Sequence, residues 1–163
     1  MPDARVKAYG IAACVFAADR LTKSLIDAYV SAFDVHTVIP GFFDIVHSQN
    51  RGVAFGLMNG SPSELRNTVL IVLSAAALVV VAAILWRAAR LERWTATGLA
   101  LVLGGAAGNL YDRIMWGRVT DFLEFYIHDL HWPTFNVADS CIVIGSCLLL
   151  LELLKHRREP AQT

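Results

Sequence analysis

The chain has 163 residues, of which 56% are hydrophobic and 17% are charged, and its 14 basic residues balance its 14 acidic residues. Soluble domains usually carry about 25% charged residues, so this composition excludes a disordered chain and indicates that lipid surrounds much of the protein. The balanced charge also excludes a basic protein that binds nucleic acid. The length suits a single domain, and we expect residues 1–163 to form one membrane domain.

Four apolar segments are predicted to form membrane-spanning helices, at about residues 8–27, 67–86, 94–112 and 137–154. A helix of about 20 apolar residues crosses a hydrocarbon core of roughly 30 Å. The second and third segments contain long uncharged runs, whereas the first and fourth reach this length only by including charged residues. The first is interpreted as a retained helix because it runs into Asp19 and Arg20, not into a signal-peptide cleavage site. The predicted fold class is therefore all-α integral membrane, with four transmembrane helices.

The basic residues predict which helix ends face the cytoplasm. Eight of the 14 lie in the two terminal tails and in the link between the second and third spans: Arg5, Lys7, Arg87, Arg90, Arg93, Lys155, Arg157 and Arg158. Cytoplasmic segments carry such an excess of Lys and Arg, so we expect both termini in the cytoplasm. Residues 28–63 and 113–136 then lie outside. The first outer segment has the β-branched and aromatic residues of two or three short strands, a small extracytoplasmic β element, and the aromatics of the second suit the membrane interface.

Three cysteines, Cys14, Cys141 and Cys147, lie inside apolar runs. They form no CxxC pair and no cluster with histidine, so the pattern favours packed thiols over a disulfide framework or a zinc site. The sequence motifs of serine hydrolases and of phosphate-binding loops are absent as well. We therefore expect neither a metal nor another cofactor.

Polar residues gather at the outer ends of three predicted spans and in the link between the third and the fourth. The group consists of Asp19, Arg20, Lys23, Asn109, Asp112, Arg113, Asp121, Asn136 and Asp139. Charged groups within a span are rare and usually face a partner or a wet cavity. Their convergence on one leaflet predicts a functional site there.

Two members of this group, Asp121 and Asp139, can approach each other if the link that contains Pro133 folds back over the helix ends. Two carboxylates at close range do not both ionise readily, so they titrate as a pair. A carboxylate beside a carboxylic acid suits hydrolysis of a peptide bond by water without a metal.

Simpler interpretations of these residues stay open at this point. Asp139 lies where an acidic residue stabilises a helix N-terminus, and Asp121 fits a solvated loop. Asp19 and Lys23 have the spacing of an ordinary i,i+4 ion pair. A serine–lysine catalytic pair would need Lys23, the one lysine near the outer face.

Two alternatives for the whole protein come from other classes. The first is a small transporter or proton channel that uses Asp19, Asp112 and Asp139 as a relay. Such a relay should place ionisable groups through the full depth of the membrane, whereas the middles of the second and third spans have none. The second is a structural membrane scaffold with no active site, which leaves the convergence of Asp and Asn residues unexplained.

Glycines mark two further features. Gly104 and Gly108 most simply permit close packing of helices. Residues 50–57 contain two more glycines among apolar residues, and we expect this segment to close as a lid over a bound substrate.

Five short motifs occur in the order, and on the predicted spans and loops, of one known family. They are D-R-L-T-K at 19–23, N-R-G-V-A-F at 50–55, G-G-A-A-G-N-L-Y-D-R at 104–113, V-T-D-F at 119–122 and F-N-V-A-D at 135–139. Each motif alone is weak. Together they extend over nearly the whole chain, which resembles the bacterial lipoprotein signal peptidases, or signal peptidase II.

This resemblance implies an aspartyl endopeptidase of the bacterial cytoplasmic (inner) membrane with its active site near the outer face. Its substrates would be diacylglyceryl-modified prolipoproteins, cut just before the lipidated cysteine, and it would bind globomycin-type inhibitors. By the family's motifs, Asp121 and Asp139 are the catalytic pair. The residues that support the site or contact the substrate would be Asp19, Lys23, Asn50, Asn109, Arg113 and Asn136. Besides the lipid bilayer and these ligands, the resemblance implies no metal, cofactor or nucleic acid.

Overall fold

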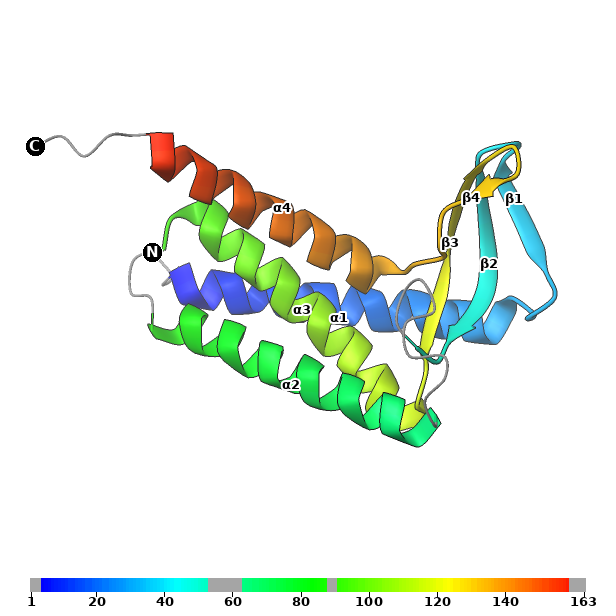
Figure 1. Ribbon diagram of the computed structural model, residues 1–163, viewed down its shortest axis with the longest axis horizontal. Coiled ribbons are helices and arrows are strands. Elements are labelled where there is room, and N and C mark those ends of the chain that lie inside the picture. The colour runs from blue at the N-terminus through cyan, green and yellow to red at the C-terminus, as the bar shows by residue number, and fades with distance from the viewer. Residues whose placement is uncertain (1–3, 53–62, 88–90, 159–163) are drawn as a thin grey trace, which may run out of the picture.

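Helices and a small antiparallel sheet make up the chain in a computed structural model, which describes residues 4–52, 63–87 and 91–158. Within these ranges the helices are α1 (Ala4–Tyr29), α2 (Ser63–Arg87), α3 (Arg93–Trp116) and α4 (Val137–Arg158). They lie side by side as a bundle with the sheet at one end, and α1 begins and α4 ends at the opposite end (Figure 1). Each of the four expected helices is present. α1 starts earlier than expected because Ala4-Arg5-Val6-Lys7 contains good helix formers and no helix breaker.

Two helices within the described residues are long and apolar enough to cross a membrane, over Glu64–Arg87 in α2 and Val137–Lys155 in α4. Their large side chains, such as Val72 and Leu151, are mostly exposed on the outside of the bundle. The buried faces of α1 and α3 combine charged, polar and small residues with a few larger apolar ones, such as Leu99 and Leu103. Exposed large apolar side chains together with buried small and polar residues are typical of helices that pack within lipid.

Glycines of α3 let its backbone touch the neighbouring helices. A Cβ atom added at Gly104 would lie 2.5 Å from the Ala12 carbonyl oxygen of α1, and one at Gly105 would lie 2.5 Å from the Ala138 carbonyl oxygen of α4. Gly108 faces the Asp19 carboxylate in the same way. The predicted role of these glycines in close helix packing is confirmed, and it draws polar groups of three helices together.

The sheet consists of β1 (Val35–Ile39), β2 (Phe43–Asn50), β3 (Val119–Ile127) and β4 (Leu130–His131), which pair antiparallel in this order. β1 and β2 confirm the strands expected in the first outer segment. The strands of the second outer segment were not predicted, because its many aromatic residues also fit the membrane interface. Pairing of β2 with β3 sets Ser48 opposite Asp121 and so brings the first outer segment to the end of α3.

The lid expected at residues 50–57 lies for the most part outside the described residues. Of this segment the structure describes Asn50 at the end of β2 and the residues up to Gly52, whose backbone amide donates to the Asn50 side-chain oxygen at 2.9 Å.

Replacing Gly104 with alanine is expected to lower the Tm of the protein in detergent, because the new methyl group would meet the Ala12 carbonyl oxygen and push α1 from α3. Such overpacking costs about 1–3 kcal/mol of unfolding free energy. The matched control is Gly10→Ala in α1, where the added Cβ has open space and helix propensity improves by up to about 1 kcal/mol. Equal Tm values for the two variants would contradict the packing role.

Candidate active site

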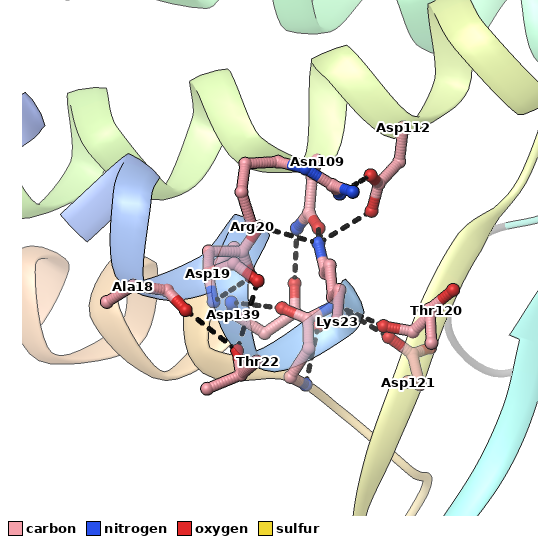
Figure 2. A network of polar contacts seen from close by, with 12 residues as sticks. Ala18, Asp19, Arg20, Thr22, Lys23, Asn109, Asp112, Thr120, Asp121 and Asp139 are labelled. Atoms are coloured by element: carbon pink, nitrogen blue, oxygen red, sulfur yellow. Dashed lines mark hydrogen bonds and ion pairs between the residues drawn. The ribbon is translucent and has the colours of Figure 1, made fainter. Parts of the chain in front are cut away.

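The buried ammonium group of Lys23 lies at the end of the bundle that carries the sheet (Figure 2). Its Nζ atom is 2.8 Å from Asp19 Oδ2 and 2.7 Å from Asp112 Oδ2, and it donates to Asn109 Oδ1 at 2.9 Å. A lysine ammonium has three N–H donors and no acceptor, and three oxygens surround it here, two in ion pairs and one in a hydrogen bond. Lys23 therefore connects α1 to α3 with no exposed surface of its own.

Each carboxylate beside Lys23 has a second partner. Asp19 Oδ1 accepts a hydrogen bond from the Ala138 backbone amide at 3.0 Å, in the first turn of α4. Asp112 forms an ion pair with Arg20, whose guanidinium also lies 4.9 Å from the Tyr111 ring centre. Two carboxylates and two cations balance, which is the condition under which buried charges are tolerated. The simple i,i+4 interpretation of Asp19 and Lys23 is correct as far as it goes, but the pair belongs to a larger network.

The amide of Asn109 connects Lys23 to Asp139. Because Lys23 can only donate, it faces the oxygen Oδ1 of Asn109, which leaves the Nδ2 group to point the other way. Nδ2 donates to Asp139 Oδ1 at 2.7 Å. The buried lysine thus sets which end of the Asn109 amide meets the Asp139 carboxylate.

Asn136 and Asp139 form a reciprocal cap at the start of α4. Asn136 Oδ1 accepts from the Asp139 backbone amide at 2.9 Å, and the Asn136 backbone amide donates to Asp139 Oδ2 at 3.4 Å. This is the geometry of a capping box, in which an acidic residue at a helix N-terminus is also favoured by the helix dipole. The predicted helix-start role of Asp139 is confirmed, and the same carboxylate also accepts from Asn109.

Asp121 lies on β3, with both of its carboxylate oxygens held by amide groups. Asn136 Nδ2 donates to Oδ1 at 2.7 Å, and Asn50 Nδ2 donates to Oδ2 at 3.1 Å. Only 2% of Asp121 is exposed, so its interpretation as a solvated loop acid is wrong. Asn50, near the start of the segment that the structure leaves undescribed, contacts this carboxylate directly.

The surroundings of Asp121 favour its protonated form. Burial, and then the nearby charge of Asp139, raise the pKa of Asp121 to about 6, although the amides of Asn50 and Asn136 and the charge of Lys23 act against the shift. A carboxyl group with this pKa holds a proton well above the pH at which an ordinary aspartate loses it.

A groove of about 580 Å³ opens onto both carboxyl groups. Its polar lining includes Asn50, Arg113, Asp121 and Asp139, and its apolar lining includes Trp132, Pro133, Phe135, Val143 and Ile144. The Arg113 guanidinium donates to the Asn109 backbone oxygen at 3.2 Å. One wall of the groove can thus bind or polarise a peptide group, while the other can bind an apolar chain.

The structure brings together all eight residues that the sequence predicted for the site. Sequence reasoning noted Arg20 and Asp112 in the polar group but did not include them among the site residues, although a charge within a predicted span was the available signal. Thr120, whose backbone oxygen accepts from Asn136 Nδ2 at 3.4 Å, was missed because nothing in the sequence distinguishes it. Among the described residues no three His, Cys, Asp or Glu side chains are placed to hold a metal ion.

Comparison with known proteins assigns the chain to a family. The family model described as signal peptidase (SPase) II matches residues 11–155. The chain belongs to the signal peptidase II family. This family cleaves signal peptides from prolipoproteins, so the chain is a protease.

Individual relatives match along almost their whole length. The lipoprotein signal peptidase of Solibacter usitatus is 62% identical over 161 residues, which are 99% of this chain and 98% of the relative. That of Oleidesulfovibrio alaskensis is 42% identical over 149 residues, covering 91% of this chain and 95% of the relative. A solved structure described as a bacterial membrane enzyme is 29% identical with a TM-score of 0.85, covering 96% of this chain and 93% of that one. The fold of this chain is thus similar to that of a bacterial membrane enzyme.

Replacing Lys23 with methionine is expected to destabilise the protein by about 3–5 kcal/mol, because Asp19 and Asp112 would stay buried without the ammonium group between them. Chemical unfolding in detergent, followed by circular dichroism, measures this loss. Lys7→Met is the control, since Lys7 lies at an exposed position near the start of α1. A surface substitution of this kind usually changes the free energy of unfolding by no more than about 0.5 kcal/mol. A loss for Lys23→Met as small as that of the control would contradict the role given to the buried lysine.

Proposed function

We propose that this chain is an aspartic endopeptidase whose catalytic pair is Asp121 and Asp139. The observation that carries the proposal is that both carboxyl groups line one groove, in which the surroundings of Asp121 favour its protonated form. Burial raises the pKa of Asp121 to about 6, so we assign this residue as the acid. Asp139 lines the same groove and accepts hydrogen bonds from Asn109 and from the Asn136 backbone amide, and we assign it as the base.

The proposed reaction uses one water molecule. Asp139 takes a proton from the water while the water oxygen bonds to the scissile carbonyl carbon. Asp121 gives its own proton to the carbonyl oxygen. The tetrahedral intermediate then collapses: the carbon–nitrogen bond breaks, and the proton on Asp139 passes to the leaving amine. Asp121 recovers its proton from the hydroxyl group that reforms the carbonyl, so both residues return to their starting states.

The remaining site residues hold this pair in place. Asn50 and Asn136 donate to the two oxygens of Asp121, and Asn109 donates to Asp139, so both carboxyl groups face the groove in fixed rotamers. We assign Asp19 and Lys23 to the orientation of Asn109. Arg113 lines the groove with donors suited to a backbone carbonyl of the bound peptide.

We propose diacylglyceryl-modified prolipoproteins as the substrates, cut just before the lipidated cysteine. The apolar wall formed by Val143, Ile144 and Trp132 suits an acyl chain beside the peptide. Each buried methylene group of such a chain anchors the substrate in lipid by about 0.8 kcal/mol, which holds the scissile bond near the membrane boundary. Globomycin-type inhibitors would occupy the same groove.

We further propose that the whole chain is one membrane domain of the bacterial inner membrane, with α1 to α4 as four spans and both termini in the cytoplasm. The support is that α1 begins, α2 ends and α3 begins at the end of the bundle opposite the sheet (Figure 1), and these helix ends include Arg5, Lys7, Arg87 and Arg93. Such an excess of basic residues marks the cytoplasmic side. The sheet and the groove then lie at the outer face, where water reaches the scissile bond.

The alternatives from other classes fit the geometry less well. A proton relay needs ionisable groups through the depth of the bundle, whereas the described network lies at the sheet end. A serine–lysine pair needs a neutral lysine beside a serine, but Lys23 forms ion pairs with Asp19 and Asp112 and donates to Asn109. A scaffold without an active site leaves a buried carboxyl group with a raised pKa in an open groove unexplained.

Asp121→Asn and Asp139→Asn are each expected to abolish cleavage of a diacylglyceryl-modified precursor, because either change removes the proton donor or the proton acceptor. The assay uses purified protein in detergent, with circular dichroism to show that each variant is folded and a chelator to test for a metal. The control is Asp34→Asn on the exposed segment after α1, which should cleave like the wild type. Activity in a folded variant of either proposed catalytic residue would remove that residue from the chemistry.

The kcat/KM of the wild type is expected to fall as the pH rises above about 6, because Asp121, with its pKa raised to about 6, then loses the proton that the reaction needs. The fall in kcat should come at higher pH, since a bound substrate removes water from Asp121 and so favours its neutral form. Profiles of kcat/KM and of kcat between about pH 5 and 9 measure both decreases. A kcat/KM that increases through this range would contradict the assignment of Asp121 as the acid.

A further inference from the structure

A second set of polar contacts lies on the other side of β3 from the groove. Thr120 and Asp121 are consecutive residues of a strand, so their side chains point to opposite faces. Thr120 Oγ1 donates to Asp27 Oδ1 at 3.0 Å, near the end of α1. His47 of β2 lies beside the same carboxylate, with its Nε2 atom 3.2 Å from Asp27 Oδ1. These contacts join α1, β2 and β3 at the residue that precedes Asp121.

The contact of the other ring nitrogen shows how many N–H groups His47 needs. Nδ1 lies 2.7 Å from the Val30 backbone oxygen, which can only accept a hydrogen bond. A neutral histidine has one N–H group, so in either tautomer one of its two ring nitrogens would present a lone pair to an oxygen. Only the imidazolium form, with a proton on each nitrogen, has attractive contacts with both the Val30 oxygen and the Asp27 carboxylate.

The burial of His47 makes this requirement stronger. Its side chain is 10% exposed, and within the described residues Nε2 is buried and forms no hydrogen bond, so its contact with Asp27 at 3.2 Å is that of an ion pair. Asp27 is 45% exposed, which limits the strength of the pair through solvent screening. The contact therefore contributes a modest free energy, which is favourable when His47 is charged and unfavourable when it is neutral.

We propose that His47, Asp27 and Thr120 are positioning residues that hold β3, and with it Asp121, against α1 when His47 carries a proton. This inference rests on the proposed function of Asp121. The residue that links the two sides is Thr120: its side chain bonds Asp27, and its backbone oxygen accepts from Asn136, which itself donates to Asp121. Loss of the proton from His47 sets its lone pair against an oxygen and loosens this side of the strand.

The other charged groups nearby are already engaged. Arg20 lines the same surface hollow as Asp27 but forms its ion pair with Asp112. Asp34, after α1, accepts from the Ser31 backbone amide, and Asp44, on β2 with His47, accepts from the Tyr126 hydroxyl group. Asp121 points to the groove. Asp27 is thus the acidic side chain that contacts His47.

Two variants of His47 separate its two contacts. His47→Gln places an amide N–H where Nε2 was, so it keeps an uncharged donor toward Asp27 that does not titrate. His47→Asn keeps a donor toward the Val30 oxygen and removes the contact with Asp27. His36→Gln, at an exposed position of β1, is the matched control. Histidine is the side chain that changes charge between about pH 5 and 8, so the profiles span that range.

The experiment measures kcat/KM of the full-length variants and the wild type in detergent at each pH, expressed as the ratio of variant to wild type. All the proteins have the same catalytic pair, so its pH dependence divides out of the ratio. For both His47 variants we expect this ratio to increase by roughly two- to fivefold from the acidic to the alkaline end, because only the wild type loses a charged contact. The ratio for His36→Gln should stay flat.

The Tm of each protein over the same pH range supplies a readout that does not depend on catalysis. The Tm of the wild type should fall relative to that of His47→Gln as the pH rises. Flat ratios for both variants would overturn the positioning role even if the Tm values shift, and unshifted Tm values would overturn the charged contact itself. If Asp121→Asn stays active while the Tm values shift as expected, the proposed catalytic role of Asp121 fails and the charged contact stands.

Discussion

The rest of the structure depends on one buried ammonium group. Lys23 has no exposed surface, so its charge must be balanced by neighbours within hydrogen-bonding distance. Asp19 and Asp112 supply that balance, and Asn109 takes the third donor. Because these partners come from α1 and α3, the charge balance holds only when the two helices are closely packed. Stability and the orientation of the site therefore come from the same contacts.

Small residues make this arrangement possible. Gly104 and Gly108 bring the backbone of α3 against α1, and Gly108 lies directly against the Asp19 carboxylate. Helices in lipid gain little from burying large apolar side chains against each other, so close backbone packing and polar contacts hold them together. Many large apolar residues lie on the outside of the bundle, where they suit lipid, while a small apolar cluster around Leu85, Leu99 and Leu103 is buried inside it. A soluble domain rarely exposes so many large apolar side chains together.

Much of this arrangement could be predicted because its signals are local in the sequence. A charge inside an apolar segment marked Asp19 and Lys23, and a glycine pattern marked the packing face of α3. The partners of each group could not be predicted, because they depend on contacts between distant parts of the chain. The Asn109 amide shows this well: its residue type was noted, but which of its ends faces Asp139 depends on Lys23, which is 86 positions away. His47 and Thr120 carry no signal of their own and become meaningful only through the pairing of β2 with β3 and their shared contact with Asp27.

The order of the site residues along the chain has a consequence for biosynthesis. α4 begins with Asn136 and Asp139, which close its first turn and complete the contacts of the earlier residues Asn109 and Asp121. A nascent chain that still lacks α4 has Asp121 without its proposed partner, and Asp19 without the amide of Ala138. With Asp121 and Asp139 as the proposed pair, a nascent chain therefore gains its catalytic site only once α4 has been synthesised and has packed against α1 and α3.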